Sequence, residues 1–531
     1  MHPLRLALVL VTMLALGACA TRPPMAADAP LDQPVATDQG RVAGSGSDVR
    51  AFLGIPYAQP PVGEGRWRPP QPALPWAGVR DGSRFGPDCM QPAEYPELRG
   101  GRGRSGAAGE GPTMSEDCLS VNVWTPARRS GEKLPVLVWV YGGGFTYGSG
   151  SHPSYDGEAL ARRGIVVVNF NYRTGLFGFM AHPQLSAESP VRSSGNYGLM
   201  DQLAALQWVQ RNIAAFGGDP GRVTVAGQSA GAMSISALMI SGRAQGLFQQ
   251  AILQSVGVMR PMADLASYEP LGLTVGPDLR QLRAMSATAL VERLTAVLPP
   301  GRELTRPRGL GIIVDGDLVR ANDHSAYTQG RYLRVPMIVG TVANEGGGLA
   351  RSLGIRDADA LRRYVATSFP GQEARAAQLY PVAGNDEVFQ VLSDLVSDTQ
   401  YRHGTRALMR IAAPAEPRLW GYRFTQRRAG DAAEPIHGAE LQYPFDNLQA
   451  PHRGRVRPFD ASDQQLARQM ADAWARFVKT GDPNGADMPA WPRYRVTDEQ
   501  LLELGTPVRA VAQPSAPRLD FLQDYLYPNR R

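Results

Sequence analysis

The sequence predicts an α/β fold in which helices cover both faces of a mostly parallel central sheet. Three features support this prediction. Residues 134–141 and 165–170 are continuous apolar runs, which are typical of strands buried on both faces. Residues 199–216 repeat an apolar side chain every three or four positions, as a helix packed on a core does. At residues 222–234 a strand-like run meets a helix-compatible segment, and this alternation favours a parallel sheet.

The remaining strands are expected on both sides of these features. Residues 39–58 predict two paired short strands with a turn at residues 44–47, and residues 119–124 predict one more. Later apolar runs predict strands at residues 223–226, 251–253, 336–339 and 419–424. Because no internal repeat and no domain linker is visible after the amino-terminal segment, residues 37–531 are expected to form a single domain.

Glycines mark the ends of two predicted helices. Gly217 follows the helix at residues 199–216, and Gly481 follows the last helix of the chain. Ser462 and Gln465 have the spacing of a capping box, so the last helix is expected to begin there. One face of that helix carries Leu466, Met470, Trp474 and Phe477.

The segment at residues 222–234, RVTVAGQSAGAMS, contains the pattern G-x-S-x-G between Gly227 and Gly231. This pattern is typical of a nucleophile elbow, in which a strained turn lifts a serine out of the strand. The two glycines leave room for the strand and the helix to close, so we predict that Ser229 is a nucleophile. The helix that follows directs its first N–H groups at the serine, where they can stabilise an oxyanion.

A serine nucleophile in this type of fold takes its acid and then its histidine from later loops. His437 follows the strand-like run at residues 419–424 and is our predicted base, whereas the other late histidines, at 324, 403 and 452, follow no strand. Glu345 follows the run at residues 336–339 and is the predicted acid. Asp315 is the competing acid, although its place in a Gly-containing turn favours a structural role.

The amino terminus predicts export and lipid attachment. Residues 1–18 have a basic residue, an apolar run and small residues, as a signal peptide does, and the run is too short for a membrane span. The sequence Leu-Gly-Ala-Cys ending at Cys19 resembles a bacterial lipobox, so Cys19 is expected to carry lipid after cleavage. Residues 19–36 are rich in proline and predict a tether. We expect the enzyme body to be held at the cell envelope, on the outer membrane or its periplasmic face.

Cysteine content and charge bound the remaining possibilities. In an oxidising compartment the two other cysteines, Cys89 and Cys118, most simply pair, and the alternative is two free buried thiols. The net charge of +6 comes from scattered basic residues, so no nucleic-acid partner is expected. Histidines and cysteines show no ligand spacing, so neither a metal nor another cofactor is expected.

Ordered motifs over most of the chain, from about Gly54 to Tyr494, resemble the type-B carboxylesterases, the family of cholinesterases and bacterial para-nitrobenzyl esterases. The motifs are GIPYAQPPVG from Gly54, SEDCLSVNVWTP from Ser115, YGGGF from Tyr141, NYRTGLFGF from Asn171, GNYGLMDQLAALQWVQRNIAAFGGDP from Gly195, GQSAGA from Gly227, LFQQAILQS from Leu247 and TGDPN from Thr480. This resemblance implies an α/β-hydrolase fold and hydrolysis of small-molecule carboxylic esters through an acyl-enzyme.

The resemblance also implies roles for individual residues. Ser229, Glu345 and His437 would form the triad, and Cys89 with Cys118 would be the first disulfide of the family. The N–H groups of Gly143, Gly144 and Ala230 would form the oxyanion hole. Two alternatives stay open: an amidase or thioesterase with the same triad, and a non-catalytic surface adhesion protein. Retention of all three triad residues argues against the adhesion protein.

Two departures from the family pattern concern substrate preference. Gln228 stands where the family has glutamate, which removes a negative charge from beside the histidine. The only aromatic residue between Cys89 and Cys118 is Tyr95, so the tryptophan that receives a quaternary ammonium at this place in cholinesterases is missing. The natural ester is not readable, because the loops at residues 257–310 and the insert at residues 99–111 match no family motif.

Overall fold

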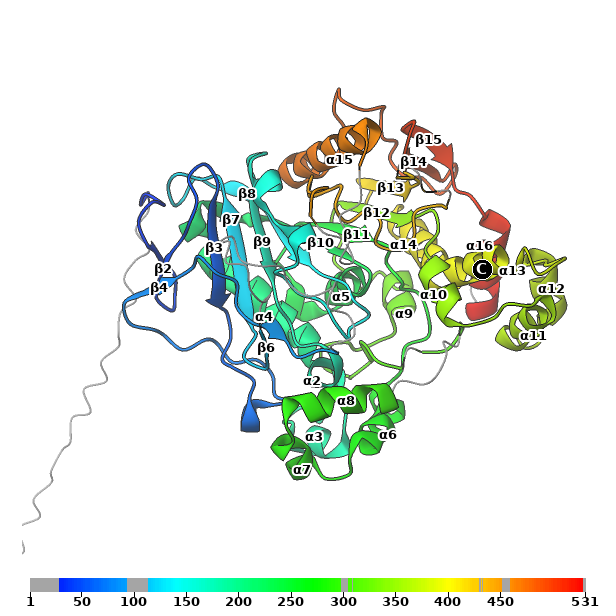
Figure 1. Ribbon diagram of the computed structural model, residues 1–531, viewed down its shortest axis with the longest axis horizontal. Coiled ribbons are helices and arrows are strands. Elements are labelled where there is room, and N and C mark those ends of the chain that lie inside the picture. The colour runs from blue at the N-terminus through cyan, green and yellow to red at the C-terminus, as the bar shows by residue number, and fades with distance from the viewer. Residues whose placement is uncertain are drawn as a thin grey trace, which may run out of the picture.

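A computed structural model describes residues 28–92, 113–297, 304–307, 309–428, 431, 433–450 and 459–528. Its centre is a sheet of ten strands (Figure 1). In spatial order these are β15 (Arg509–Ala512), β14 (Gln500–Leu504), β13 (Leu419–Phe424), β12 (Met337–Val342), β11 (Gln250–Gln254), β10 (Gly218–Gln228), β8 (Leu134–Val140), β9 (Val166–Phe170), β7 (Ser120–Thr125) and β3 (Arg50–Pro56). The seven strands from β14 to β9 pair in parallel, and the flanking pairs are antiparallel. The predicted mostly parallel sheet is therefore confirmed.

Helices pack on both faces of this sheet, as β13 illustrates. Trp420 and Tyr422 pack against aromatic rings of α15 (Ala461–Thr480), because alternate residues of a strand share a face. Gly421 between them faces Met409 of α14 (His403–Ala412) on the other side. The strands of the parallel part are buried almost without interruption, which explains their continuous apolar runs.

The remaining helices fall into three groups. Against the sheet lie α1 (Glu158–Ala161), α4 (Tyr197–Asn212) and α5 (Ala230–Met239), and α9 (Asp323–Thr328) packs on α14. At the lower edge of Figure 1 lie α2 (Gly175–Phe179), α3 (Pro183–Glu188), α6 (Leu265–Val275), α7 (Leu279–Ala284) and α8 (Ala287–Val297). At the right lie α10 (Gly347–Ser352), α11 (Ala358–Ser368), α12 (Glu373–Leu379), α13 (Val388–Ser397) and α16 (Ala516–Leu526), which enclose a second apolar cluster.

Two local predictions need correction. The turn after β2 (Arg41–Ala43) is closed by hydrogen bonds between Ser45 and Ala51, but β2 does not pair with β3. It joins β1 (Val35–Ala36) and β4 (Val79–Asp81) in a separate small sheet. The cap of α15 was also predicted wrongly: its helix begins after Asp460, whose carboxylate accepts the N–H groups of Ser462 and Asp463. Aspartate caps as well as serine does, so the pattern alone did not separate the two.

Gly217 and Gly481 end their helices in the left-handed conformation, with φ of 80° and 75°, as predicted. Cys19, the signal peptide, Tyr95 and the insert at residues 99–111 lie outside the described residues. Among the helices that the structure describes, none is both long and apolar enough to span a bilayer.

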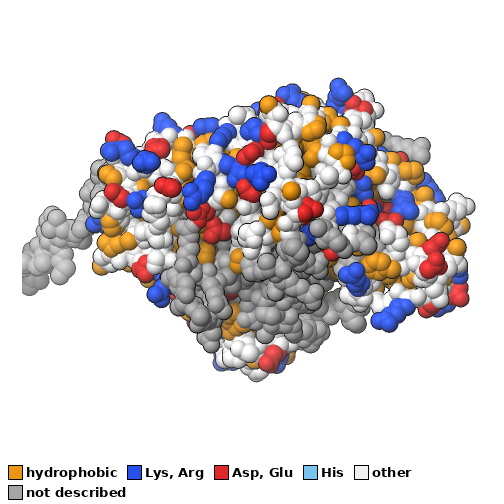
Figure 2. Space-filling model, turned by 45° about the horizontal axis from the view of Figure 1, so that its top comes forward, with side chains coloured by type: hydrophobic (Ala, Val, Ile, Leu, Met, Phe, Trp, Pro, Cys, Tyr) orange, Lys and Arg blue, Asp and Glu red, His pale blue; other side chains and the backbone are white. Residues whose placement is uncertain are grey.

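Basic and acidic side chains are interspersed on the face drawn in Figure 2. Many of the arginines are engaged in ion pairs, such as that of Arg163 with Asp446 and Asp472, at 2.8 and 2.6 Å. On the described part of that face, the two signs of charge therefore alternate.

Candidate active site

Four loops meet at the edge of the sheet where parallel strands end. They follow β8, β10, β12 and β13, and they carry, in that order, the glycine-rich segment, Ser229, Glu345 and His437. Neighbouring parallel strands place their carboxyl ends at one edge, so residues that are distant in sequence lie together there. β10 is the central strand among these, with β8 on one side and β11 on the other.

Ser229 lies at a strained turn between β10 and α5. Its backbone has φ 56° and ψ −122°, a conformation that non-glycine residues rarely adopt. The turn is tightly packed: a Cβ added at Gly231 would lie 2.0 Å from the carbonyl oxygen of Val140, and one added at Gly227 would lie 2.8 Å from it. The Ser229 N–H donates to the Gln254 carbonyl at 2.9 Å, which ties the turn to β11. The predicted elbow is thus present, and its two glycines are required sterically.

Glu345 is fully buried after β12, and both of its carboxylate oxygens are bonded. Oε1 accepts hydrogen bonds from the Val342 N–H at 2.9 Å and from the Ser255 hydroxyl at 2.7 Å. Oε2 lies 2.6 Å from Nδ1 of His437. With one oxygen held by two donors, the other is fixed in direction towards the imidazole, which is what an orienting acid requires.

His437 is held on three sides. Nδ1 faces Glu345, the ring of Tyr401 lies against the imidazole with centroids 4.4 Å apart, and Nε2 lies 3.1 Å from Nε2 of Gln228. If Nδ1 carries the proton towards the carboxylate, Nε2 has a lone pair that accepts from the Gln228 amide. The residue before Ser229 therefore contacts the nitrogen that a general base uses.

The glycine-rich loop after β8 packs on the elbow. A Cβ added at Gly142 would lie 3.0 Å from Cβ of Ser229, so the two segments are in contact. Gly143 and Gly144 adopt φ of 122° and 62°, which turns the backbone sharply at this point. Ala230 is the first residue of α5, whose N-terminal end is positive. These are the segments whose N–H groups were predicted to form an oxyanion hole.

A second carboxyl group, that of Glu440, lies behind the histidine. It is fully buried and its Oε1 accepts from the Gln254 amide at 3.3 Å. Burial, and then the charge of Glu345, raise the pKa of Glu440 to about 7. The two neighbouring buried carboxyl groups thus differ in role. Glu345 bonds the imidazole, whereas the carboxyl group of Glu440 is shifted towards its own protonated, neutral form.

The competing residues lie elsewhere. Asp315 accepts from the amide of Asn196 at 2.8 Å and from the N–H groups of Asp317 and Val319, so it stabilises a turn. His403 lies at the start of α14, where its Nε2 is 3.1 Å from Oε1 of Gln523, and burial lowers its pKa to about 4. Among the described residues, no group of His, Cys, Asp and Glu has the arrangement of a metal site.

Cys89 and Cys118 form a disulfide, with the two Cα atoms 5.0 Å apart. The disulfide lines a small hollow together with apolar residues, such as Trp67 and Phe177, and charged residues, such as Arg66 and Glu116. It closes the segment that includes the insert at residues 99–111.

The elbow, the carboxylate–imidazole pair and the order of the strands define the α/β-hydrolase fold. Comparison with known proteins makes the assignment specific. The model of the carboxylesterase family matches residues 32–522. The chain is 43% identical over 477 residues to fumonisin B1 esterase of Sphingopyxis macrogoltabida, covering 89% of this chain and 86% of that protein. It is 33% identical to para-nitrobenzyl esterase of Bacillus subtilis (strain 168), covering 94% and 99%.

Solved structures agree with this. A para-nitrobenzyl esterase structure superposes with a TM-score of 0.81 at 30% identity, covering 94% of this chain and all of that one. A thermophilic para-nitrobenzyl esterase gives the same TM-score at 31% identity, covering 92% and 99%. The chain belongs to the carboxylesterase family and is a carboxylic ester hydrolase.

Sequence reasoning did not single out Ser255, Glu440 or Tyr401. Ser255 ends the LFQQAILQS motif and Glu440 lies three residues after His437, so both stand in or beside a predicted site segment. Tyr401 reaches the site from the helical region 388–412, which no motif marked. Its contact depends on tertiary packing alone.

Proposed function

We propose that this protein is a serine carboxylesterase that works through an acyl-enzyme with Ser229, His437 and Glu345 as its triad. The observation that carries the proposal is the 2.6 Å contact between Glu345 Oε2 and His437 Nδ1 beside a strained serine turn. A carboxylate on Nδ1 fixes the imidazole so that Nε2 is the basic nitrogen. Strain at the serine lifts its hydroxyl out of the strand.

In the first half of the reaction, the Ser229 oxygen attacks the ester carbonyl while its proton passes to Nε2 of His437. The carbonyl oxygen becomes an oxyanion, which the N–H groups of Gly143, Gly144 and Ala230 stabilise. His437 then gives the proton to the leaving alcohol, and the C–O bond breaks. The alcohol departs and the acyl group stays on Ser229.

In the second half, water takes the place of the alcohol. His437 Nε2 removes a proton from the water, whose oxygen attacks the acyl carbon. The tetrahedral intermediate collapses, the proton passes to the Ser229 oxygen, and the carboxylic acid leaves. The amide of Gln228 lies within hydrogen-bond distance of Nε2 of His437. It must therefore move away from Nε2 before this nitrogen accepts a proton from Ser229 or, in the second half of the reaction, from water.

A fluorophosphonate tests the nucleophile directly, since only a serine activated by a base attacks phosphorus readily. We expect tryptic mapping to place the label on Ser229 alone, and Ser229→Ala to abolish it. Ser236→Ala, about two helical turns further along α5, is the matched control and should label normally. Full labelling or turnover in Ser229→Ala would overturn the proposal.

Matched ester, thioester and amide substrates separate the esterase from its two catalytic alternatives. The same oxyanion forms from each substrate, so the comparison depends on the leaving group. The relatives named for ester hydrolysis favour the ester. A higher kcat/KM for the thioester or the amide would reassign the activity without changing the triad.

We also propose that the enzyme is exported and anchored by lipid on Cys19. The lipobox-like sequence supports this, and the disulfide between Cys89 and Cys118 suits an oxidising compartment. Cys19→Ser should release the protein from membranes or leave it unprocessed, because stable anchoring requires acyl chains. Intact-mass measurement of the purified protein would disprove the anchor if it showed another amino terminus and no lipid.

A further inference from the structure

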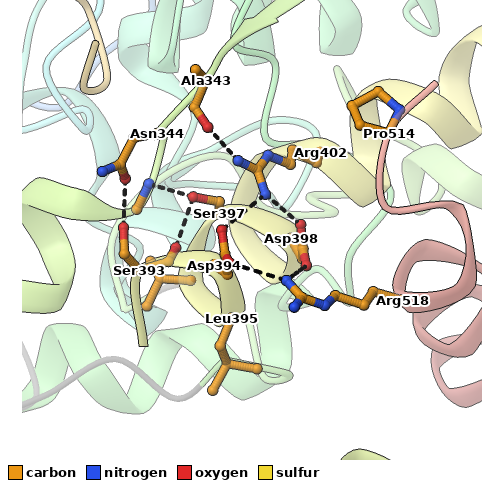
Figure 3. A network of polar contacts seen from close by, with 12 residues as sticks. Ala343, Asn344, Ser393, Asp394, Leu395, Ser397, Asp398, Arg402, Pro514 and Arg518 are labelled. Carbon is orange, nitrogen blue, oxygen red and sulfur yellow. Dashed lines mark hydrogen bonds and ion pairs between the residues drawn. The ribbon is translucent and has the colours of Figure 1, made fainter. Parts of the chain in front are cut away.

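A helical segment that contains no triad residue packs against the turn that carries the catalytic acid. It comprises α13 (Val388–Ser397), a π-helical turn (Asp398–Arg402) and α14, and it lies along the loop after β12 (Figure 3). π-turns inside α-helices are uncommon and occur frequently at functional sites. None of the residues in this turn was assigned a role by the family motifs.

The segment contacts the acid turn on both sides of Glu345. On one side, the Arg402 guanidinium donates to the carbonyl of Ala343. On the other, the N–H of Gly346 donates to the Ser397 hydroxyl at 2.7 Å, and that hydroxyl in turn donates to the carbonyl of Ser393 at 2.7 Å. The backbone two residues before the acid and one residue after it is therefore fixed by one continuous helical segment (Figure 3).

Arg402 is itself buried and held in place. Its Nη1 lies 2.9 Å from Asp398 and 3.5 Å from Asp394. Burial disfavours its charge, but the carboxylates of Asp398 and Asp394, with that of Glu345 added, outweigh burial and raise the pKa of Arg402. The guanidinium is thus a permanent positive charge beside the acid turn.

The π-turn explains how one helix makes all these contacts. Ser393, Ser397 and Tyr401 are spaced by four residues and face Asn344, Gly346 and His437 in turn. In an α-helix each step of four residues drifts by about 40° around the axis, so the third residue would turn away. The wider π-turn reduces this drift, and Tyr401 still reaches the imidazole.

The same holds for the neighbouring stripe of Asp394, Asp398 and Arg402, which also has a spacing of four. Arg518 of α16 joins this stripe from outside, at 3.2 Å from Asp394 and 3.8 Å from Asp398. It belongs to the ion-pair network but has no contact with the acid turn among those drawn in Figure 3. Both arginines therefore support the ion-pair network, but of the two only Arg402 also bonds the acid turn among the contacts drawn in Figure 3.

We propose that Arg402 and Ser397 are positioning residues for the catalytic acid. They hold the backbone at 343 and 346 so that Glu345 Oε2 stays on His437 Nδ1 while charge forms on the imidazole. The inference rests on the proposed triad. It goes beyond the triad because it assigns a function to two residues that bond the backbone of the acid turn rather than the triad side chains.

The test is a double-mutant cycle with a p-nitrophenyl ester. Arg402→Met should lower kcat by roughly 10- to 100-fold with little change in KM, because a small displacement of the acid affects the transition state most. In a Glu345→Gln background the same substitution should change kcat by less than about twofold, since the group through which it acts is gone. Arg518→Met is the matched control and should leave kcat near the wild-type value.

Each outcome decides the inference. An equal loss of kcat from Arg402→Met in both backgrounds, or an equal loss in Arg518→Met, would show a merely structural role and overturn it. If Arg402→Met does not fold, as judged by its thermal unfolding, Ser397→Ala takes its place in the same cycle with the same expectation. Failure of the triad is seen separately, because fluorophosphonate labelling would then persist in Ser229→Ala.

Discussion

The turn that carries Ser229 and the turn that carries Glu345 are built by different means. The serine turn is fixed sterically: Gly227 and Gly231 carry no side chain, which lets β10 and α5 close on the Val140 carbonyl of β8, and Ser229 itself adopts the strained conformation. The acid turn is fixed by polar contacts with residues far away in the sequence, such as Ser255, which lies 90 positions before Glu345. The residues that permit the serine turn stand together in one short motif, whereas the residues that fix the acid turn are spread along the chain.

Removal of the base, His437, should have the largest single effect on catalysis. We expect His437→Ala to lower kcat by on the order of 10³ or more, by analogy with other triads, because no other group can take the serine proton. His403→Ala should retain most of the activity, since that histidine contacts Gln523 rather than the site. Steady-state kinetics with a thermal unfolding control measures both, and the reverse result would require a different base.

Substitutions in the serine turn should act through steric clashes rather than through changes of charge. A Cβ at Gly231 would overlap the Val140 carbonyl at 2.0 Å, so Gly231→Ala should destabilise the fold by about 3 kcal/mol and displace the elbow. Gly348→Ala, where the added Cβ meets nothing within 4 Å, is the control and should be close to neutral. Denaturant unfolding measures both changes. Equal stability of the two variants would contradict the steric account.

Glu440, which lies beside the acid turn, should make the stability of the fold depend on pH. Its folded-state pKa, about 7, lies above the ordinary value of 4.5, so the folded protein binds this proton more tightly. The stabilising effect is full below about pH 4.5 and is lost as pH rises through 7. Glu440→Gln stays neutral, so its stability relative to wild type should rise by about 3 kcal/mol between pH 4.5 and 8.

Unfolding midpoints of both proteins at a series of pH values check this expectation. Glu64→Gln serves as the control, because the Glu64 side chain is 85% exposed and should give a constant difference. A constant difference for Glu440→Gln as well would show that this carboxyl group is not held neutral by its surroundings.

Gln228 precedes Ser229 in the sequence and contacts His437, which the acid turn holds. A substitution at this position should have the smallest effect on activity. A carboxylate at this position, 3.1 Å from Nε2 of His437, would stabilise the imidazolium. In Gln228→Glu the acid limb of the kcat/KM profile should therefore move to higher pH, and a cationic ester should gain a few-fold over a neutral ester matched in shape. The gain should be larger at low salt. An unchanged profile with an unchanged preference would mean that the contact has no catalytic consequence.

The same contrast explains which parts could be predicted from the sequence. Apolar runs predicted the parallel strands because strands buried on both faces tolerate few polar residues, and chain order predicted Glu345 and His437. The position of Gln228 beside the histidine was anticipated from the resemblance to the family, which has glutamate before the nucleophile.

The supporting residues could not be predicted with the same ease. The pattern SDLVSDTQYR, from Ser393 to Arg402, repeats Ser-Asp at a spacing of four, which is a visible signal for two stripes on one helix. Nothing local shows that the helix contains a π-turn or that it lies against the acid turn, because both depend on long-range packing. Glu440 likewise gains its altered pKa only from burial beside Glu345.

The central claim, an acyl-enzyme on Ser229, is tested most directly by trapping that intermediate. Protein mixed with p-nitrophenyl acetate is quenched in acid during turnover and mapped by peptide mass spectrometry. We expect an initial burst of p-nitrophenol if deacylation is the slower step, and an acetyl group on the peptide that contains Ser229, absent in Ser229→Ala. An acetyl group on another residue that disappears together with activity, or full turnover by Ser229→Ala, would contradict the account.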